Sequence, residues 1–211
     1  MFGILKKREK IFCIGFNKTG TTTLAKVLED FGYRLADQDQ SERLFRYWKE
    51  RNFKPIIEFC KKADAFQDIP FSLPFTFQVL HFAYPHAKFI LTVRDSEEEW
   101  YESLYRYHVN LFGDGKTVTE EDLQNAKHIW KGWAFEVNQH RYHPPKGEPY
   151  HKETLIKSYK THNYIVEEYF HDKPDSFIKI NVAKKEDYFR LAQFLNKKPL
   201  YDDFPWLNRS K

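Results

Sequence analysis

Hydrophobic positions in this chain follow two alternating periods. Four short runs are continuously or mostly apolar, as in strands that are buried on both faces of a parallel sheet. These runs are residues 11–16, 63–67, 88–93 and 176–181. Between them, apolar residues recur every three or four positions, which predicts amphipathic helices. The predicted helices cover residues 21–31, 41–51, 55–62, 75–84, a stretch from 97 onward, 119–137, 152–171 and 188–195.

This order of elements predicts the fold class. Strands that alternate with helices form parallel sheets with helices on both faces. We therefore expect an α/β protein with three layers, α/β/α, and a central parallel sheet. The length of 211 residues suits one domain, residues 1–211, with an N-terminal extension at 1–10 and an irregular tail at 199–211.

The segment between the first strand and the first helix is suited to binding phosphate. Gly20 allows close approach of the backbone, and the helix begins directly after it, where free N–H groups and the helix dipole favour an anion. Lys18 adds a charge, and four threonines add hydroxyl donors. The threonines are Thr19, Thr21, Thr22 and Thr23.

The position of the lysine separates two kinds of phosphate loop. A Walker A loop has the order G-x-x-x-x-G-K-[ST], with lysine after the second glycine. Here the order is Gly15-Phe16-Asn17-Lys18-Thr19-Gly20-Thr21-Thr22, with lysine two residues before that glycine. The pattern is a P-loop-like strand, loop and helix, but it is not that of a nucleoside triphosphatase.

At these residues the chain resembles the sulfotransferase family, whose signature is P-K-[ST]-G-T-T. Asn17 stands where the family usually has proline. The resemblance implies that Lys18 to Thr23 hold the 5′-phosphate of 3′-phosphoadenosine 5′-phosphosulfate (PAPS). It also implies that Lys18 neutralises charge on the bridging oxygen during sulfuryl transfer. The closing region of the chain is also similar to small bacterial-type sulfotransferases.

A second segment strengthens the resemblance. In sulfotransferases the matching strand ends in an arginine, which grips the 3′-phosphate together with a serine of the next helix. Here the strand 88–93 is followed by Arg94. The family's serine usually comes eight residues later, where this chain has Glu102. We assign the role to Ser103, because a hydroxyl can donate to a phosphate and a carboxylate would repel it. The extra residue is then expected within 95–97.

A catalytic base is expected near the same edge of the sheet. Ligands of open α/β sheets bind beyond the carboxyl ends of the strands. Asp68 follows the strand 63–67 and is the candidate base for the acceptor's proton. His81 and His86 are the alternatives, although a structural role is expected more for each of them.

Composition limits the classes of partner. The net charge of +4 fits anionic ligands but is too small and too evenly spread to argue for nucleic-acid binding by itself, and no nucleic-acid partner is expected. The two cysteines, Cys13 and Cys60, predict neither a disulfide framework nor a metal cluster, and they suit the cytoplasm. His140 and His143 have no third ligand at a useful spacing, so no metal is expected. No signal peptide or transmembrane segment is predicted.

The function implied is transfer of a sulfuryl group from PAPS to an acceptor hydroxyl or amine, leaving 3′-phosphoadenosine 5′-phosphate (PAP). The resemblance suggests a carbohydrate or a small metabolite as acceptor. Two alternatives stay open. One is a nucleotide or small-molecule kinase of the P-loop type, which would share the fold. The other is a catalytically degenerate module that binds PAP without turnover.

Overall fold

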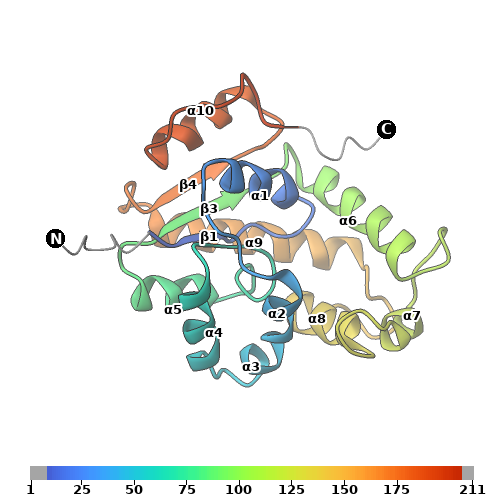
Figure 1. Ribbon diagram of the computed structural model, residues 1–211. Helices are drawn as coiled ribbons and strands as arrows, with labels where there is room; N and C mark the ends of the chain where they lie inside the picture. Colours follow the sequence, from blue (N-terminus) through green and yellow to red (C-terminus); the bar gives the residue numbers. More distant parts are fainter. Residues whose placement is uncertain (1–8, 206–211) are drawn as a thin grey trace.

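The fold is built on a four-stranded sheet, seen in a computed structural model that describes residues 9–205. The strands are β1 (Ile11–Cys13), β2 (Ala65–Phe66), β3 (Lys88–Thr92) and β4 (Phe177–Ile180). All neighbours are parallel, and the spatial order is β2-β1-β3-β4 (Figure 1). The expected parallel sheet is confirmed, although β1 and β2 are shorter than the apolar runs that contain them.

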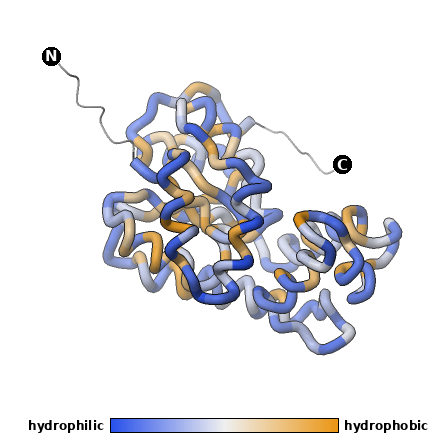
Figure 2. Tube along the Cα trace, turned by 60° about the horizontal axis from the view of Figure 1, so that its bottom comes forward, coloured by the Kyte–Doolittle hydropathy of each residue, from blue (hydrophilic) through white to orange (hydrophobic). Residues whose placement is uncertain are grey.

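Helices cover both faces of this sheet. Successive side chains of a strand point to opposite faces, so Ile11 and Cys13 pack on one side and Phe12 on the other. The first face is covered by α1 (Thr21–Asp30) and α10 (Lys185–Phe194), and the second by α5 (Thr76–Ala83), α9 (Lys152–Phe170) and their neighbours. Figure 2 shows hydrophobic segments through the middle of the molecule and mostly hydrophilic ones outside.

Two glycines determine the course of the chain before and after α1. A Cβ at Gly15 would lie 2.2 Å from Oγ1 of Thr92, so only glycine allows this close approach to β3. At the other end of α1, Gly32 has a φ of +83° and its N–H donates to the carbonyl of Glu29 at 2.8 Å. Gly32 therefore forms a glycine C-cap at the end of α1.

Helix α6 (Glu97–Leu111) follows β3 and begins at a side-chain cap. The hydroxyl of Ser96 accepts from the N–H of Glu99 at 3.1 Å. The carboxylate of Glu99 lies 2.9 Å from Nη1 of Arg94 and pairs with it, instead of accepting from the backbone N–H of Ser96. Only one of the two hydrogen bonds of a capping box is therefore formed, because Glu99 pairs with Arg94.

Several predicted helices are divided in the structure. Residues 41–51 contribute to α2 (Gln38–Arg43) and α3 (Phe45–Lys49), and 55–62 to α4 (Lys54–Phe59) and a 3-10 turn, Cys60–Lys62. The prediction of one helix over 119–137 is wrong. The chain forms α7 (Glu120–Asn125) and α8 (Trp133–Tyr142), because the backbone turns extended at Ala126 and left-handed at Gly132.

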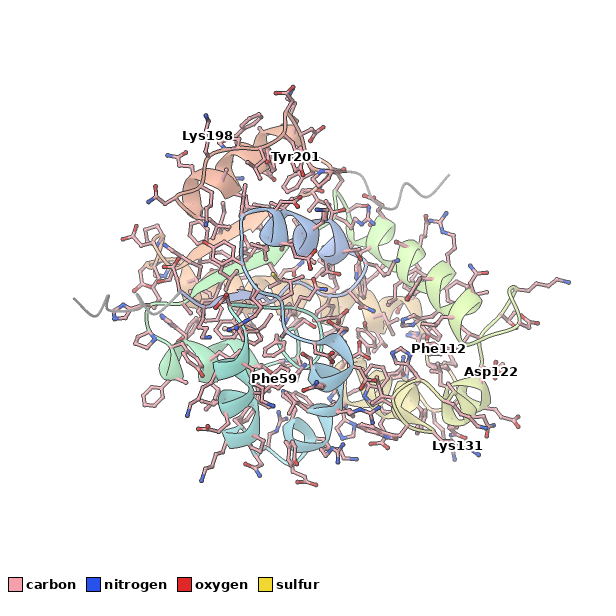
Figure 3. The ribbon with its side chains drawn as sticks, viewed as in Figure 1. Phe59, Phe112, Asp122, Lys131, Lys198 and Tyr201 are labelled. Atoms are coloured by element: carbon pink, nitrogen blue, oxygen red, sulfur yellow. The ribbon has the colours of Figure 1, made fainter. Side chains whose placement is uncertain are left out.

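The end of the described chain packs back on α10. Phe204 is buried, and its ring centroid lies 5.3 Å from that of Tyr188. The hydroxyl of Tyr201, labelled beside α10 in Figure 3, donates to Asp30 at 2.8 Å. Residues 199–205 form no helix or strand, and the rest of the predicted tail lies outside the described residues. Within 9–205, no helix is both long and apolar enough to cross a membrane.

Candidate active site

A cavity of about 490 Å³ lies where the strands of the sheet end. Each strand is followed by at least one residue that lines it: Lys18 after β1, Asp68 after β2, Arg94 after β3 and Val182 after β4. Gly20, Thr21, Thr22, Thr23 and Ser103 also line it. The structure thus gathers nearly all residues singled out in the sequence around one cavity at the expected edge of the sheet.

The N-terminus of α1 is open toward this cavity. Its cap residue, Gly20, has a φ of +96°, no side chain caps the first turn, and that turn contains no acidic residue. A Cβ at Gly20 would lie 2.2 Å from Cγ2 of Val182, so both the conformation and the space require glycine. The free N–H groups and the helix dipole are therefore available to an anion.

Lys18 stands beside this helix end in an electropositive environment. Its Nζ lies 4.0 Å from the centroid of the Tyr107 ring, on α6. Burial lowers the pKa of Lys18, and the nearby cations Arg94 and Arg106 lower it further, while Asp68 acts in the opposite direction. Within residues 9–205, no carboxylate forms an ion pair with Lys18. A bound anion would relieve this accumulation of positive charge.

Arg94 joins the phosphate loop to α6. Its Nε donates to the carbonyl oxygen of Lys18 at 2.7 Å, and its Nη1 pairs with Glu99 at 2.9 Å. Ser103 lines the cavity, whereas Glu102 is exposed and does not. In this register, the serine nine residues after Arg94 faces the cavity.

Thr19 differs from the other threonines of the loop. Its hydroxyl is fully buried, donates to the carbonyl of Phe16 at 2.5 Å and is hydrogen-bonded to Oγ1 of Thr92 at 2.5 Å. The expectation that this hydroxyl serves the ligand is wrong, because it fastens the loop to β3. The backbone of Thr19 remains part of the loop.

The far side of the cavity carries two carboxylates. Asp68 has a left-handed backbone, with a φ of +55°, and burial raises its pKa against the opposing effect of Arg141. Glu42, on α2, accepts from Gln38 at 2.8 Å and from Nε2 of His128 at 2.9 Å. Burial also raises the pKa of Glu42.

Several lining residues were not predicted from the sequence. They are Glu42, Tyr107, His108, His128 and Arg141. His108 is hydrogen-bonded through Nδ1 to the hydroxyl of Tyr150 at 2.6 Å, and burial with nearby Arg141 and Lys18 lowers its pKa to about 3. Phe112, at the end of α6 nearest α7 and α8 in Figure 3, also lines the cavity, and its ring packs against that of His128. A spaced motif could not have indicated these positions, because they come from three separate helices and a turn.

The alternative bases lie elsewhere. Neither His81 nor His86 lines the cavity. Nδ1 of His81 is hydrogen-bonded to the hydroxyl of Tyr169 at 3.0 Å, in an aromatic cluster with Phe89 and Phe170. Of the three candidate bases, Asp68 is therefore the one that lines the cavity.

Two features bear on the metal-dependent alternative. A P-loop kinase needs an aspartate that holds Mg²⁺. Asp95 does not line the cavity, and its Oδ1 accepts from Asn181 at 3.0 Å and lies 3.4 Å from Nζ of Lys184. In the part of the chain that the structure describes, no group of three or more His, Cys, Asp or Glu side chains could hold a metal ion.

Comparison with known proteins agrees with this geometry. The family model described as "Sulfotransferase domain" matches residues 10–211, nearly the whole chain. Comparison with curated proteins gives no significant match. The match to the family model extends over the strand–loop–helix, Arg94 and the helices that enclose the cavity. This chain belongs to the sulfotransferase domain family.

Proposed function

We infer that this protein transfers a sulfuryl group from PAPS to the hydroxyl or amine of a carbohydrate or small metabolite. Membership of the family supports sulfuryl transfer in general. The observation that carries the choice of donor is the uncapped N-terminus of α1, which lines one cavity together with Lys18 and Arg94. Anion-binding sites at two positions suit a donor with two phosphate-bearing ends.

The residues present fit such a donor. The 5′-phosphate would be held by the N–H groups at the start of α1 and by the hydroxyls of Thr21, Thr22 and Thr23. No side-chain cap competes for these N–H groups. Arg94 and Ser103 would hold the 3′-phosphate from the next strand and helix. The lowered pKa of Lys18, caused partly by Arg94 and Arg106, supports an anion among these cations.

When bound, PAPS supplies the sulfuryl group. The reaction breaks the bond between sulfur and the 5′-phosphate oxygen and forms a bond between sulfur and the acceptor oxygen or nitrogen. Lys18 stabilises the charge that develops on the bridging oxygen, and Asp68 accepts the proton that the acceptor loses. The products are the sulfated acceptor and PAP.

Asp68 is favoured over Glu42 as the base. Both oxygens of Glu42 already accept hydrogen bonds, from Gln38 and His128. Burial raises the pKa of Asp68, and the nearby charges of Arg141 and Lys18 limit that rise. These cations favour the ionised form, which a base at neutral pH requires.

The acceptor side of the cavity combines polar and aromatic side chains. Trp133 and Phe112 offer apolar surface, and Gln38, Glu42 and His128 offer hydrogen bonds. Such a mixture suits a polyhydroxylated acceptor, whose rings have both apolar faces and polar edges.

Thermal shift assays with PAP and with ATP·Mg²⁺ test this proposal against the kinase alternative. PAP should raise the melting temperature, since a ligand that binds only the native state stabilises it. Stabilisation by ATP·Mg²⁺ alone would reject the proposal. Transfer of ³⁵S from PAPS to a panel of sugars and small alcohols then tests turnover. Binding of PAP with no transfer to any acceptor would favour the catalytically degenerate module.

A further inference from the structure

Arg141, near the end of α8, is a buried cation that the sequence did not single out. Its side chain is 4% exposed, and it lines the cavity. Nη1 donates to Oδ1 of Asn17 at 3.2 Å, and Nη2 donates to Oγ of Ser72 at 2.7 Å. The guanidinium carbon lies 4.8 Å from the centroid of the Phe16 ring. These contacts hold the guanidinium in one place.

The partners of Arg141 are neutral. Among residues 9–205, no carboxylate oxygen lies within ion-pair distance of its nitrogens. Its Nε is buried and makes no hydrogen bond of normal geometry in that part of the chain, although the side chain lies close to the hydroxyl of Tyr142. A charge taken out of water normally needs an opposite charge or a full set of hydrogen bonds. A cavity-lining guanidinium that has no ion pair and an unsatisfied Nε is suited to an anionic group of a ligand.

The contacts of Arg141 locate that anion within the cavity. Asn17 directly precedes Lys18, so the guanidinium lies beside the phosphate loop, at a residue next to the one that Arg94 contacts. Its charge lowers the pKa of Asp68 and of His108, which both line the acceptor side. Arg141 therefore stands where the loop meets the acceptor side, and the group that must pass this point is the sulfonate.

We propose that Arg141 binds the sulfonate group during its transfer and that Asn17 positions Arg141 for this purpose. This inference rests on the proposed use of PAPS. Arg141 contacts the sulfonate oxygens, whereas Lys18 faces the bridging oxygen. Asn17 is a positioning residue, because it acts through the guanidinium.

The proposal also explains why the loop departs from the family signature. Proline, the usual residue at position 17, has no side-chain oxygen to accept from Arg141. Asparagine provides that oxygen, and its backbone carbonyl still accepts from Nε1 of Trp100 at 3.1 Å. In this chain, Asn17 and Arg141 form one unit, and the substitution adapts the loop to an arginine from α8.

Isothermal titration with two ligands tests the proposal. PAPS carries the sulfonate and PAP does not, and both carry the two phosphates. Without acceptor, Arg141→Gln should weaken PAPS binding about tenfold or more, the effect of losing a charged hydrogen bond, and change PAP binding less than twofold. Asn17→Ala should weaken PAPS selectively by a smaller factor. Arg34→Gln is the matched control, because Arg34 is 65% exposed and does not line the cavity; it should change neither affinity.

The outcomes separate this inference from the proposed function. Equal loss of PAPS and PAP affinity in Arg141→Gln would mean that Arg141 has a structural role, and it would overturn the inference. Unchanged PAPS affinity with a higher KM for an anionic acceptor would also overturn it. If Arg141→Gln fails to fold, Asn17→Ala decides through the same ratio of affinities. Failure of the unmodified protein to bind PAP would reject the proposed function itself. Normal PAP binding by the unmodified protein, together with an unaltered ratio of PAPS affinity to PAP affinity in both variants, would reject only the role of Arg141.

Discussion

The N-termini of α1 and α6 differ in what lies beside their free backbone N–H groups. Both helices follow neighbouring parallel strands, β1 and β3, and both begin with unpaired backbone N–H groups. At α6 the hydroxyl of Ser96 accepts from the first turn, and three glutamates, residues 97–99, complement the dipole. At α1 there is neither a side-chain cap nor an acid, and Lys18 stands alongside.

This difference indicates where the protein has left room for a ligand. A helix that only needs to fold gains from a cap and from acidic residues in its first turn. Helix α1 lacks both and instead has a glycine and three threonines facing the cavity. Arg94 lies between the two helix ends and is bound to both, through the carbonyl of Lys18 and the carboxylate of Glu99.

The largest effect is expected from removing the charge beside α1. Lys18→Ala should lower kcat for sulfuryl transfer by about 100- to 1000-fold, the usual loss for one donor aimed at developing charge. Steady-state kinetics with saturating PAPS measure this. Lys160→Ala is the control, because Lys160 is an exposed lysine that pairs with Glu97 of α6. Activity of Lys18→Ala within twofold of the parent would remove Lys18 from the mechanism.

Arg94, which links the two helix ends, should give the next largest effect. Arg94→Gln should weaken PAP binding by roughly 10- to 150-fold, because a hydrogen bond to a charged group contributes about 1.5–3 kcal/mol. Adenosine 5′-phosphate lacks the 3′-phosphate and should lose much less affinity. Titration of both nucleotides measures the difference. Equal losses for the two ligands would instead assign Arg94 to holding the loop through the carbonyl of Lys18.

Ser103 should have a smaller effect, which tests the register of α6. Ser103→Ala should weaken PAP binding by up to about tenfold, the value of one hydrogen bond of about 1 kcal/mol or slightly more. Glu102→Ala is the matched control from the adjacent, exposed position, and it should leave the affinity unchanged or slightly improved. A loss at Glu102 with none at Ser103 would show that the helix is used in the other register.

The smallest effect on binding is expected at the cap of α6. Ser96→Ala should lower the free energy of unfolding by about 1 kcal/mol and leave PAP affinity within twofold. Denaturant unfolding and titration on the same sample measure the two quantities. A large loss of PAP affinity would mean that the two helix ends are not separate in function.

The contrast between these helix ends also explains what the sequence could predict. The phosphate loop and Arg94 are local patterns, in which a few consecutive residues determine backbone and chemistry. Other features depend on contacts between distant segments. Thr19 turns its hydroxyl inward because Thr92 lies against it. The break between α7 and α8 follows from backbone turns at Ala126 and Gly132 that the apolar spacing did not indicate.

The acceptor side of the cavity is the clearest case of nonlocal assembly. Glu42 comes from α2, His128 from the turn after α7 and Arg141 from α8. In the sequence each is one charged or polar residue among many. Only the packing of these helices brings them to the ends of β1 and β2, where Asp68 was predicted from its position after a strand.

A crystal structure with PAP bound tests the central claim most directly. The account predicts the 5′-phosphate against the N–H groups at the start of α1, beside Lys18, and the 3′-phosphate within hydrogen-bond distance of Arg94 and Ser103. A nucleotide whose phosphates lie away from α1, or on one side of the cavity only, would contradict it.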